Sequence, residues 1–202
     1  MSNTSVLKYF GGSTLLACAA LACGAQRFLD YPVRQPSNYK ISAQQGDVSI
    51  ALEPVESVDD QQTYFHTVLT PSGFLPVLVV VRNRSKSDSL LLDKQSISYG
   101  FGETDKAAPR ENSAGQKAVI ASTGFVPFIG PFLASGLAKD ASQIKQNLML
   151  RELQSGTISP DTTVHGFLYV PVPKKGPRPK IHIQFPIAWT NSNTTSVLPI
   201  EF

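Results

Sequence analysis

The sequence predicts a mainly β protein, an antiparallel β-sandwich with a helical, apolar insert. Short segments alternate apolar and polar residues with a period of two, which is typical of strands that bury one face. Turns rich in Gly, Pro, Asn and Ser separate these segments. Only 16% of the 202 residues are charged, which is too few for the exposed faces of a helical bundle, whereas 42% are hydrophobic, enough for a core.

Four predicted strands lie between residues 39 and 81. Residues 39–44 alternate between apolar and polar side chains, and in residues 48–53 Val48, Ile50 and Leu52 alternate with Ser49, Ala51 and Glu53. Residues 63–69 (TYFHTVL) are rich in aromatic and β-branched residues and are expected to form a third strand. Residues 75–81 (LPVLVVV) are a continuous apolar run, which predicts a strand buried on both faces.

The remaining predicted strands lie on both sides of the insert. Their ranges are 89–92, 96–101, 163–171, 181–185 and 196–201. A hairpin turn at 173–177 is expected to join two of them and to make His165 and His182 cross-strand neighbours. Strands of this kind with polar turns favour a two-layered antiparallel fold.

The N-terminal segment has the layout of an export signal. One basic residue, Lys8, precedes an uncharged stretch from Tyr9 to Gln26 that ends in small residues. Its apolar part is shorter than the ~20 residues that span a bilayer as a helix. A cleaved signal peptide over residues 1–22 is therefore expected. The chain has no Cys after Cys23, which fits an oxidising compartment.

The segment Ala20-Leu21-Ala22-Cys23 resembles the signal of bacterial lipoproteins, in which an acylated Cys becomes the first residue of the mature protein. The resemblance implies a lipid on Cys23, with Cys18 as the competing site. Because Gly24 is not the Asp that retains such proteins, it also implies an outer-membrane lipoprotein that faces the periplasm. The alternative, two cysteines buried in the N-terminal helix of a cytosolic protein, stays open.

The mature chain divides into three parts. Residues 23–38 are expected to be a lipid anchor and tether, since they are polar and contain two prolines. Apolar residues such as Tyr31 and Val33 leave a second possibility, an arm packed on the domain or on a partner. Residues 39–202 form the predicted β-sandwich domain, with an insert at 103–156.

Two segments resemble immunoglobulin-like accessory domains of secreted bacterial proteins. The first is residues 75–85 with 90–93, a buried strand that ends in Asn83 and a polar turn. The second is residues 158–171, where a Pro-led turn precedes a strand with Gly and aromatic residues. The resemblance implies an immunoglobulin-like antiparallel β-sandwich and no particular activity.

The insert combines an apolar stretch with a helical one. Residues 118–138 carry no charge, whereas residues 139–154 place Ile144, Leu148 and Arg151 on one helical stripe. The apolar stretch can be core, a surface that docks a partner, or a segment that dips into a bilayer. The candidates for partner or membrane contact are Phe125, Phe128, Ile129, Phe132 and Leu133.

The sequence contains no motif for catalysis, for a cofactor or for a metal. His66, His165 and His182 lack the spacing of metal ligands. Net charge is only +3 and is scattered, which argues against nucleic-acid binding. The basic residues at 174–180 are expected to be a solubilising turn. We therefore expect no enzyme activity, no cofactor, no metal and no nucleic-acid partner.

These observations together predict a binding or structural role at a membrane. The expected function is a lipid-anchored envelope protein, a subunit of a multiprotein envelope or secretion assembly that meets the membrane through its lipid and also has protein partners. Two alternatives stay open: a carrier of an apolar ligand, and an immunity or inhibitor lipoprotein.

Overall fold

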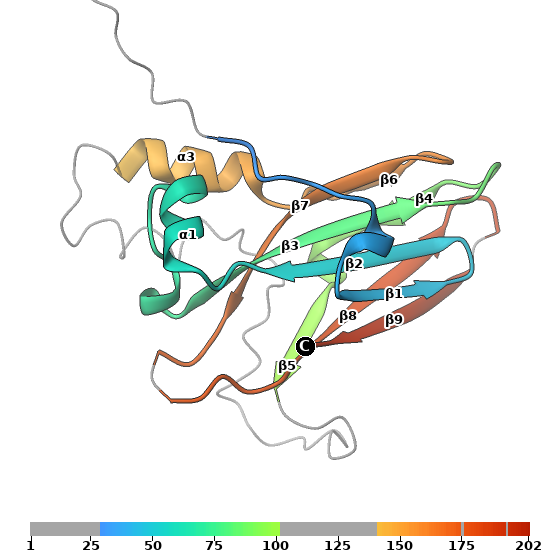
Figure 1. The fold of residues 1–202 in the computed structure, drawn as a ribbon. Coiled ribbons are helices and arrows are strands. Elements are labelled where there is room, and N and C mark those ends of the chain that lie inside the picture. The colour runs from blue at the N-terminus through green and yellow to red at the C-terminus, as the bar shows by residue number, and fades with distance from the viewer. Residues whose placement is uncertain (1–28, 102–140, 175, 193) are drawn as a thin grey trace, which may run out of the picture.

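A computed structural model describes residues 29–101, 141–174, 176–192 and 194–202, which form two antiparallel β-sheets and two α-helices (Figure 1). The first sheet has the order β1-β2-β3-β7, made of β1 (Ile41–Gln45), β2 (Val48–Pro54), β3 (Phe74–Asn83) and β7 (Thr163–Pro171). In the second sheet, β8 pairs with β9 along one edge and with β5 and β4 along the other. Strand β6 pairs with the outer edge of β4. The strands of the second sheet are β4 (Leu90–Leu92), β5 (Ser98–Phe101), β6 (Gly156–Ile158), β8 (Ile181–Trp189) and β9 (Thr195–Glu201).

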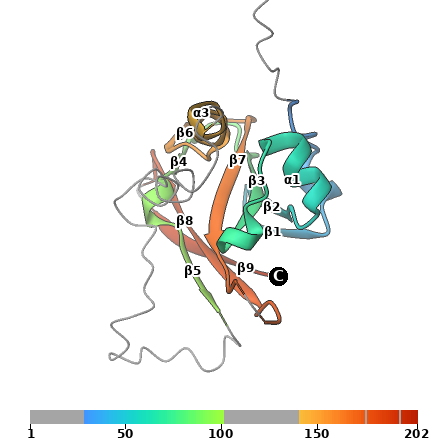
Figure 2. The ribbon, with the colours of Figure 1, turned by 90° about the vertical axis from the view of Figure 1, so that its left-hand side faces the viewer.

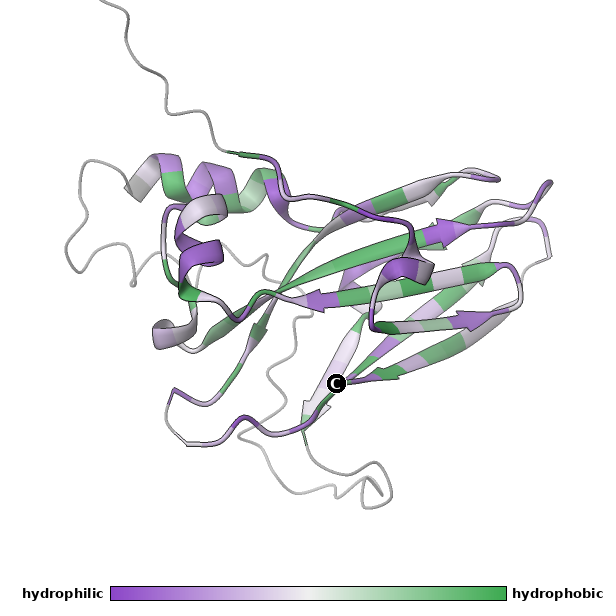
Figure 3. Cartoon of the chain, in the orientation of Figure 1, coloured by the Kyte–Doolittle hydropathy of each residue, from purple (hydrophilic) through white to green (hydrophobic). Residues whose placement is uncertain are grey.

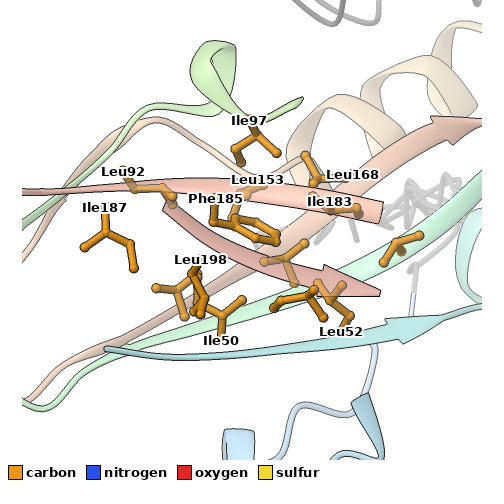
Figure 4. Packing of buried hydrophobic residues seen from close by; sticks show 14 of the residues in the cluster. Ile50, Leu52, Leu92, Ile97, Leu153, Leu168, Ile183, Phe185, Ile187 and Leu198 are labelled. Atoms are coloured by element: carbon orange, nitrogen blue, oxygen red, sulfur yellow. The ribbon is translucent and has the colours of Figure 1, made fainter. Parts of the chain in front are cut away.

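The main core lies between the two sheets, which pack face to face in an arrangement consistent with a β-sandwich (Figure 4). Ile50 and Leu52 of β2 enter it from the first sheet, and Ile183 and Phe185 of β8 enter it from the second. All four side chains are at most 1% exposed. The period-two pattern of the sequence correctly predicts that these four side chains are buried.

Strand β3 is buried on both faces, as its continuous apolar run predicts. Leu75, Val77, Val79 and Val81 face the core between the sheets, whereas Leu78 and Val80 face a second core on the outer side. Two helices, α1 (Val58–Phe65) and α3 (Ala141–Arg151), cover that outer side (Figure 2). Figure 3 shows β3 as the most uniformly apolar strand of its sheet. Burial of each such side chain, relative to leaving it exposed to water, contributes about 1.5–3 kcal/mol to the stability of the fold.

The strand expected at residues 63–69 is wrong, because the segment is the end of α1 and the loop that follows. The side chain of Ser57 accepts a hydrogen bond from the backbone N–H of Asp60 and caps the helix. Asp59 and Asp60 in the first turn also favour a helix start. The helix ends at His66, whose φ of 56° is left-handed. The apolar residues of the segment, Phe65 and Leu69, are buried from this helix and loop.

The hairpin expected at 173–177 is also wrong. Strands β7 and β8 belong to different sheets, so residues 172–180 cross from one sheet to the other. His165 lies opposite Val80 of β3, whereas His182 lies opposite Gly100 and Glu201. The two histidines are therefore not cross-strand neighbours.

The described end of the insert contains both the expected helix and an unexpected strand. In α3, Ile144 and Leu148 are buried against the outer face of the first sheet, as their spacing predicts. The helix α3 ends at Arg151, three residues before the end of the predicted helical stretch, and Gly156 begins β6. The sequence analysis missed β6 because three residues are too few to show alternation.

Candidate functional site

The clearest feature outside the sheets is the segment 29–38, which we call the N-terminal arm. Its residue Tyr31 packs edge-on against the ring of Tyr64 in α1, with centroids 4.7 Å apart, and against Phe167 of β7 at 5.4 Å. Burial, followed by the negative charge of Glu53, holds the pKa of Tyr31 well above its ordinary value. These contacts fasten the arm to the outer, helix-bearing face of the first sheet.

The second half of the arm is held by polar contacts and a buried proline. The guanidinium of Arg34 donates to Oε1 of Glu53 at 2.5 Å and lies over the ring of Tyr39 at 4.7 Å. The charge of Glu53 raises the pKa of Arg34. The 3₁₀ turn Pro36–Asn38 then buries Pro36. Residues 29–38 thus pack on the domain, which is the second possibility that the sequence left open for them.

The start of the arm meets the end of α3. Nη2 of Arg151 donates to the carbonyl oxygen of Leu29 at 2.5 Å, and Nε of Arg151 donates to Oδ1 of Asn147 at 2.6 Å. Next to this contact lies a groove of about 420 Å³, lined by Asp30, Tyr31, Val33, Leu78, Leu150, Arg151, His165, Gly166 and Phe167. We call it the arm groove. Leu150 at 76% and Leu29 at 59% are among the most exposed large apolar side chains of the described residues.

A second groove lies between the 3₁₀ turn of the arm and the polar end of the first sheet. Gln44, Ser49 and Arg82 stand opposite one another on β1, β2 and β3. The groove measures about 550 Å³ and is lined by Gln35, Pro36, Ser37, Ser42, Ala43, Gln44, Ser49, Arg82 and Arg84. This lining contains two guanidiniums and no carboxylate, although Arg82 is ion-paired with Asp161 beside the groove.

The arginines of the second groove are already engaged within the chain. Arg82 donates from Nη1 to Gln35 at 2.6 Å and from Nη2 to Asp161 at 3.0 Å. Its Nε is buried without a hydrogen-bond partner among the described residues. Arg84 donates to Oε1 of Gln44 at 2.9 Å. The bond between Arg82 and Gln35 ties the arm to the sheet, and the remaining bonds engage both arginines within the domain.

The histidines and the basic turn do not form a reactive cluster. His66 ends α1, His165 lies exposed on β7, and His182 on β8 lies 3.5 Å from a carboxylate oxygen of Glu201. In the described ranges, no three His, Cys, Asp or Glu side chains are grouped as metal ligands would be. In the basic turn, Arg178 pairs with Glu56, and Lys180 pairs with Glu201 as well.

The residues that the sequence singles out for lipidation and contact lie outside the described residues. These are Cys23, its competitor Cys18, and Phe125, Phe128, Ile129, Phe132 and Leu133. The described chain stops at Phe101, the end of β5, and resumes at Ala141, the start of α3. None of the helices that the structure describes is both long and apolar enough to cross a bilayer.

The arm and its groove were not singled out as a site by the sequence analysis. The signal that points to them is the apolar content of residues 29–33, which left packing on the domain open beside the expected tether. The aromatic partners Tyr64 and Phe167 are far apart in the sequence, so the pattern could not identify them. Comparisons of this chain with family models, with curated proteins and with solved structures returned no match.

Proposed function

We propose that this protein is an exported, lipid-anchored envelope protein with a binding or structural role, a subunit of a multiprotein envelope or secretion assembly. One observation carries the proposal: the lipoprotein-like segment Ala20–Cys23 lies near the end of an uncharged stretch, and Tyr31, which packs into the domain, follows eight residues after Cys23. A lipid on Cys23 would therefore hold a folded body at the membrane through a short connection. The diacyl or triacyl modification of the family gives stable attachment, whereas one chain does not.

The proposed location of the protein is the periplasmic face of the outer membrane. Gly24 supports it, because an Asp at that position is the residue that retains lipoproteins of this family at the inner membrane. Fractionation of the two membranes tests the location. Recovery of the lipidated protein in the inner-membrane fraction would leave the anchor in place and overturn the location.

The proposal includes an immunoglobulin-like topology, and the strand order supports it. In such a fold, strands A, B and E share one sheet, and strands C, F and G share the other. The neighbours β2-β3-β7 correspond to A-B-E, and the neighbours β4-β8-β9 correspond to C-F-G. Strand β1 is then an addition at the outer edge of A. Immunoglobulin-like domains commonly present their edges and loops to other proteins, which agrees with a binding role.

Metabolic labelling with an alkyne fatty acid tests the anchor. We expect the wild-type chain and Cys18→Ser to incorporate the label, and Cys23→Ser to lose it. Loss in Cys18→Ser alone would move the anchor to Cys18. A wild-type protein that takes up no label and keeps Met1 would overturn the export and anchoring proposal altogether.

Cross-linking in intact membranes tests the assembly role separately. We expect adducts larger than the monomer, formed with other envelope proteins. The apolar residues 118–138, which include Phe125 and Phe128, are the proposed contact segment. Charged substitutions at Phe125 and Phe128 should therefore reduce the adducts without affecting lipid incorporation. A lipidated protein that yields only monomer would overturn the assembly role and leave the anchor in place.

A further inference from the structure

We infer that the surface formed by Leu29, Val33 and Leu150, here the lipid-facing surface, contacts the bilayer to which Cys23 is attached. The inference rests on the proposed function, since it requires the lipid on Cys23. It adds which side of the domain meets the membrane, and through which residues. The occupant is a phospholipid surface, and a protein partner at the same place is an alternative that the experiment distinguishes.

The length of the connection limits the orientation of the domain. Five residues, 24–28, lie between Cys23 and Leu29, and the six Cα–Cα steps of this connection span at most about 20 Å. A domain of this size is about 40 Å across. Leu29 must therefore lie in the half of the domain that is nearer to the bilayer. A free tether through Asn38 would allow any orientation, but Tyr31 and Pro36 are packed on the sheet.

The arm places apolar side chains at that end of the domain. Arg151, the neighbour of Leu150 in α3, donates a hydrogen bond to the carbonyl oxygen of Leu29, so the start of the arm lies beside the end of α3. Leu29 is 59%, Val33 38% and Leu150 76% exposed, and Val33 and Leu150 line the arm groove together. In Figures 1 and 2, α3 and the start of the arm lie at one end of the molecule, and β9 lies toward the other.

Scattered exposed leucines need no explanation by themselves. Here the lipid anchor explains the exposed leucines, because a short connection raises the effective concentration of this surface at the bilayer. A contact that is weak for a free protein becomes persistent under that condition. Apolar side chains of this kind enter the boundary between headgroups and acyl chains, where their burial is favourable.

The test uses the full chain, expressed in a bacterial host that acylates lipoproteins. After processing at Cys23 the mature chain contains no free thiol, so Leu150→Cys offers one labelling site. Val197→Cys, on β9, is the matched control, because Val197 is also an exposed apolar residue at 51%. Each variant carries a fluorescent label and is reconstituted in vesicles of phosphatidylethanolamine and phosphatidylglycerol that contain a doxyl-labelled quencher lipid.

We expect the label at position 150 to lose most of its fluorescence to the quencher lipid, and the label at position 197 to keep it. Equal quenching at both positions, or quenching at neither, would overturn the lipid-facing surface. Flotation of the same protein with the vesicles would show that the anchor is nevertheless in place. A label at position 150 that is shielded from aqueous iodide but not quenched by lipid would assign the surface to a protein. A chain that does not float with vesicles would overturn the anchor and the surface together.

Discussion

The backbone of Leu153 passes over Gly166 so closely that a Cβ atom on Gly166 would lie 2.4 Å from Cα of Leu153. At the same place the N–H of Leu153 donates to the carbonyl oxygen of Phe167 at 2.9 Å. The chain that leaves α3 is thus seated on the edge of β7, and Gly166 is the residue that allows it. This crossing positions α3, and with it Leu150 and Arg151, relative to the first sheet.

Gly166→Ala is expected to destabilise the domain by about 2–4 kcal/mol, because the obstructing atoms are backbone and cannot turn away. Gly156→Ala is the matched control, since nothing lies within 4 Å of a Cβ at that position. Urea unfolding of both variants measures the difference. Equal midpoints for the two would show that the crossing is not as close as described.

Gln61 joins α1 to the loop that follows it. Its Nε2 donates to Val55 O at 2.7 Å and to Thr70 Oγ1 at 2.6 Å, and its Oε1 accepts from the N–H groups of Leu69 and Thr70. The side chain is completely buried. Gln61→Ala leaves these groups without partners and should cost about 2–4 kcal/mol. The exposed neighbour Gln62, changed to Ala, should alter the free energy of unfolding by less than about 0.5 kcal/mol.

Asn83 closes the polar turn at the end of β3. Its Nδ2 lies within hydrogen-bond distance of the carbonyl oxygens of Asp88, Ile158 and Ser159, and its Oδ1 accepts from the N–H of Ser85. Asn83→Ala should therefore lower stability by about 2–3 kcal/mol. The exposed Asn38, changed to Ala, should change it little. Thermal unfolding followed by circular dichroism compares the two, and similar shifts in Tm would contradict the proposed role of Asn83.

Two buried tyrosines make stability depend on alkaline pH. Burial raises the pKa of Tyr31 and of Tyr169, whose hydroxyl donates to Leu148 O. The unfolded chain releases these protons near pH 10, whereas the folded chain keeps them to higher pH. Their contribution is therefore complete below about pH 10 and is lost as pH rises above it.

Urea unfolding at about pH 9 and about pH 11 measures this loss. The double variant Tyr31→Phe, Tyr169→Phe should lose less stability between the two pH values than the wild type, although it is less stable at both. An unchanged difference between the two pH values would show that these tyrosines ionise as easily in the folded chain as in the unfolded one.

Much of the β structure followed from the sequence because alternation reports which face of a strand is buried. This held for Ile50 and Leu52 in β2 and for the doubly buried β3. The strand prediction was wrong at residues 63–69. Their side chains favour a strand, but the cap at Ser57 and two acidic residues in the first turn stabilise a helix there. Strand β6 was missed because it is too short to carry a pattern.

The candidate site was less accessible to sequence reasoning. The N-terminal motif resembles a lipidation signal at Cys23, but the position of the arm depends on contacts of Tyr31 with Tyr64 and Phe167, which are distant in the sequence. The prediction of a hairpin between β7 and β8 was wrong for the same reason, because the partners of each strand are distant in the sequence. A local turn pattern does not say whether the next strand pairs with the previous one or crosses to the other sheet.

The sequence by itself determined the mainly β character and the apolar faces of the strands, because these depend on local periodicity and composition. Only the tertiary structure decided that residues 29–38 pack on the domain, that residues 172–180 cross between sheets, and that Gly166 lies beneath Leu153. Those outcomes depend on which distant surfaces bury each other best, and long-range packing leaves little trace in a short stretch of residues.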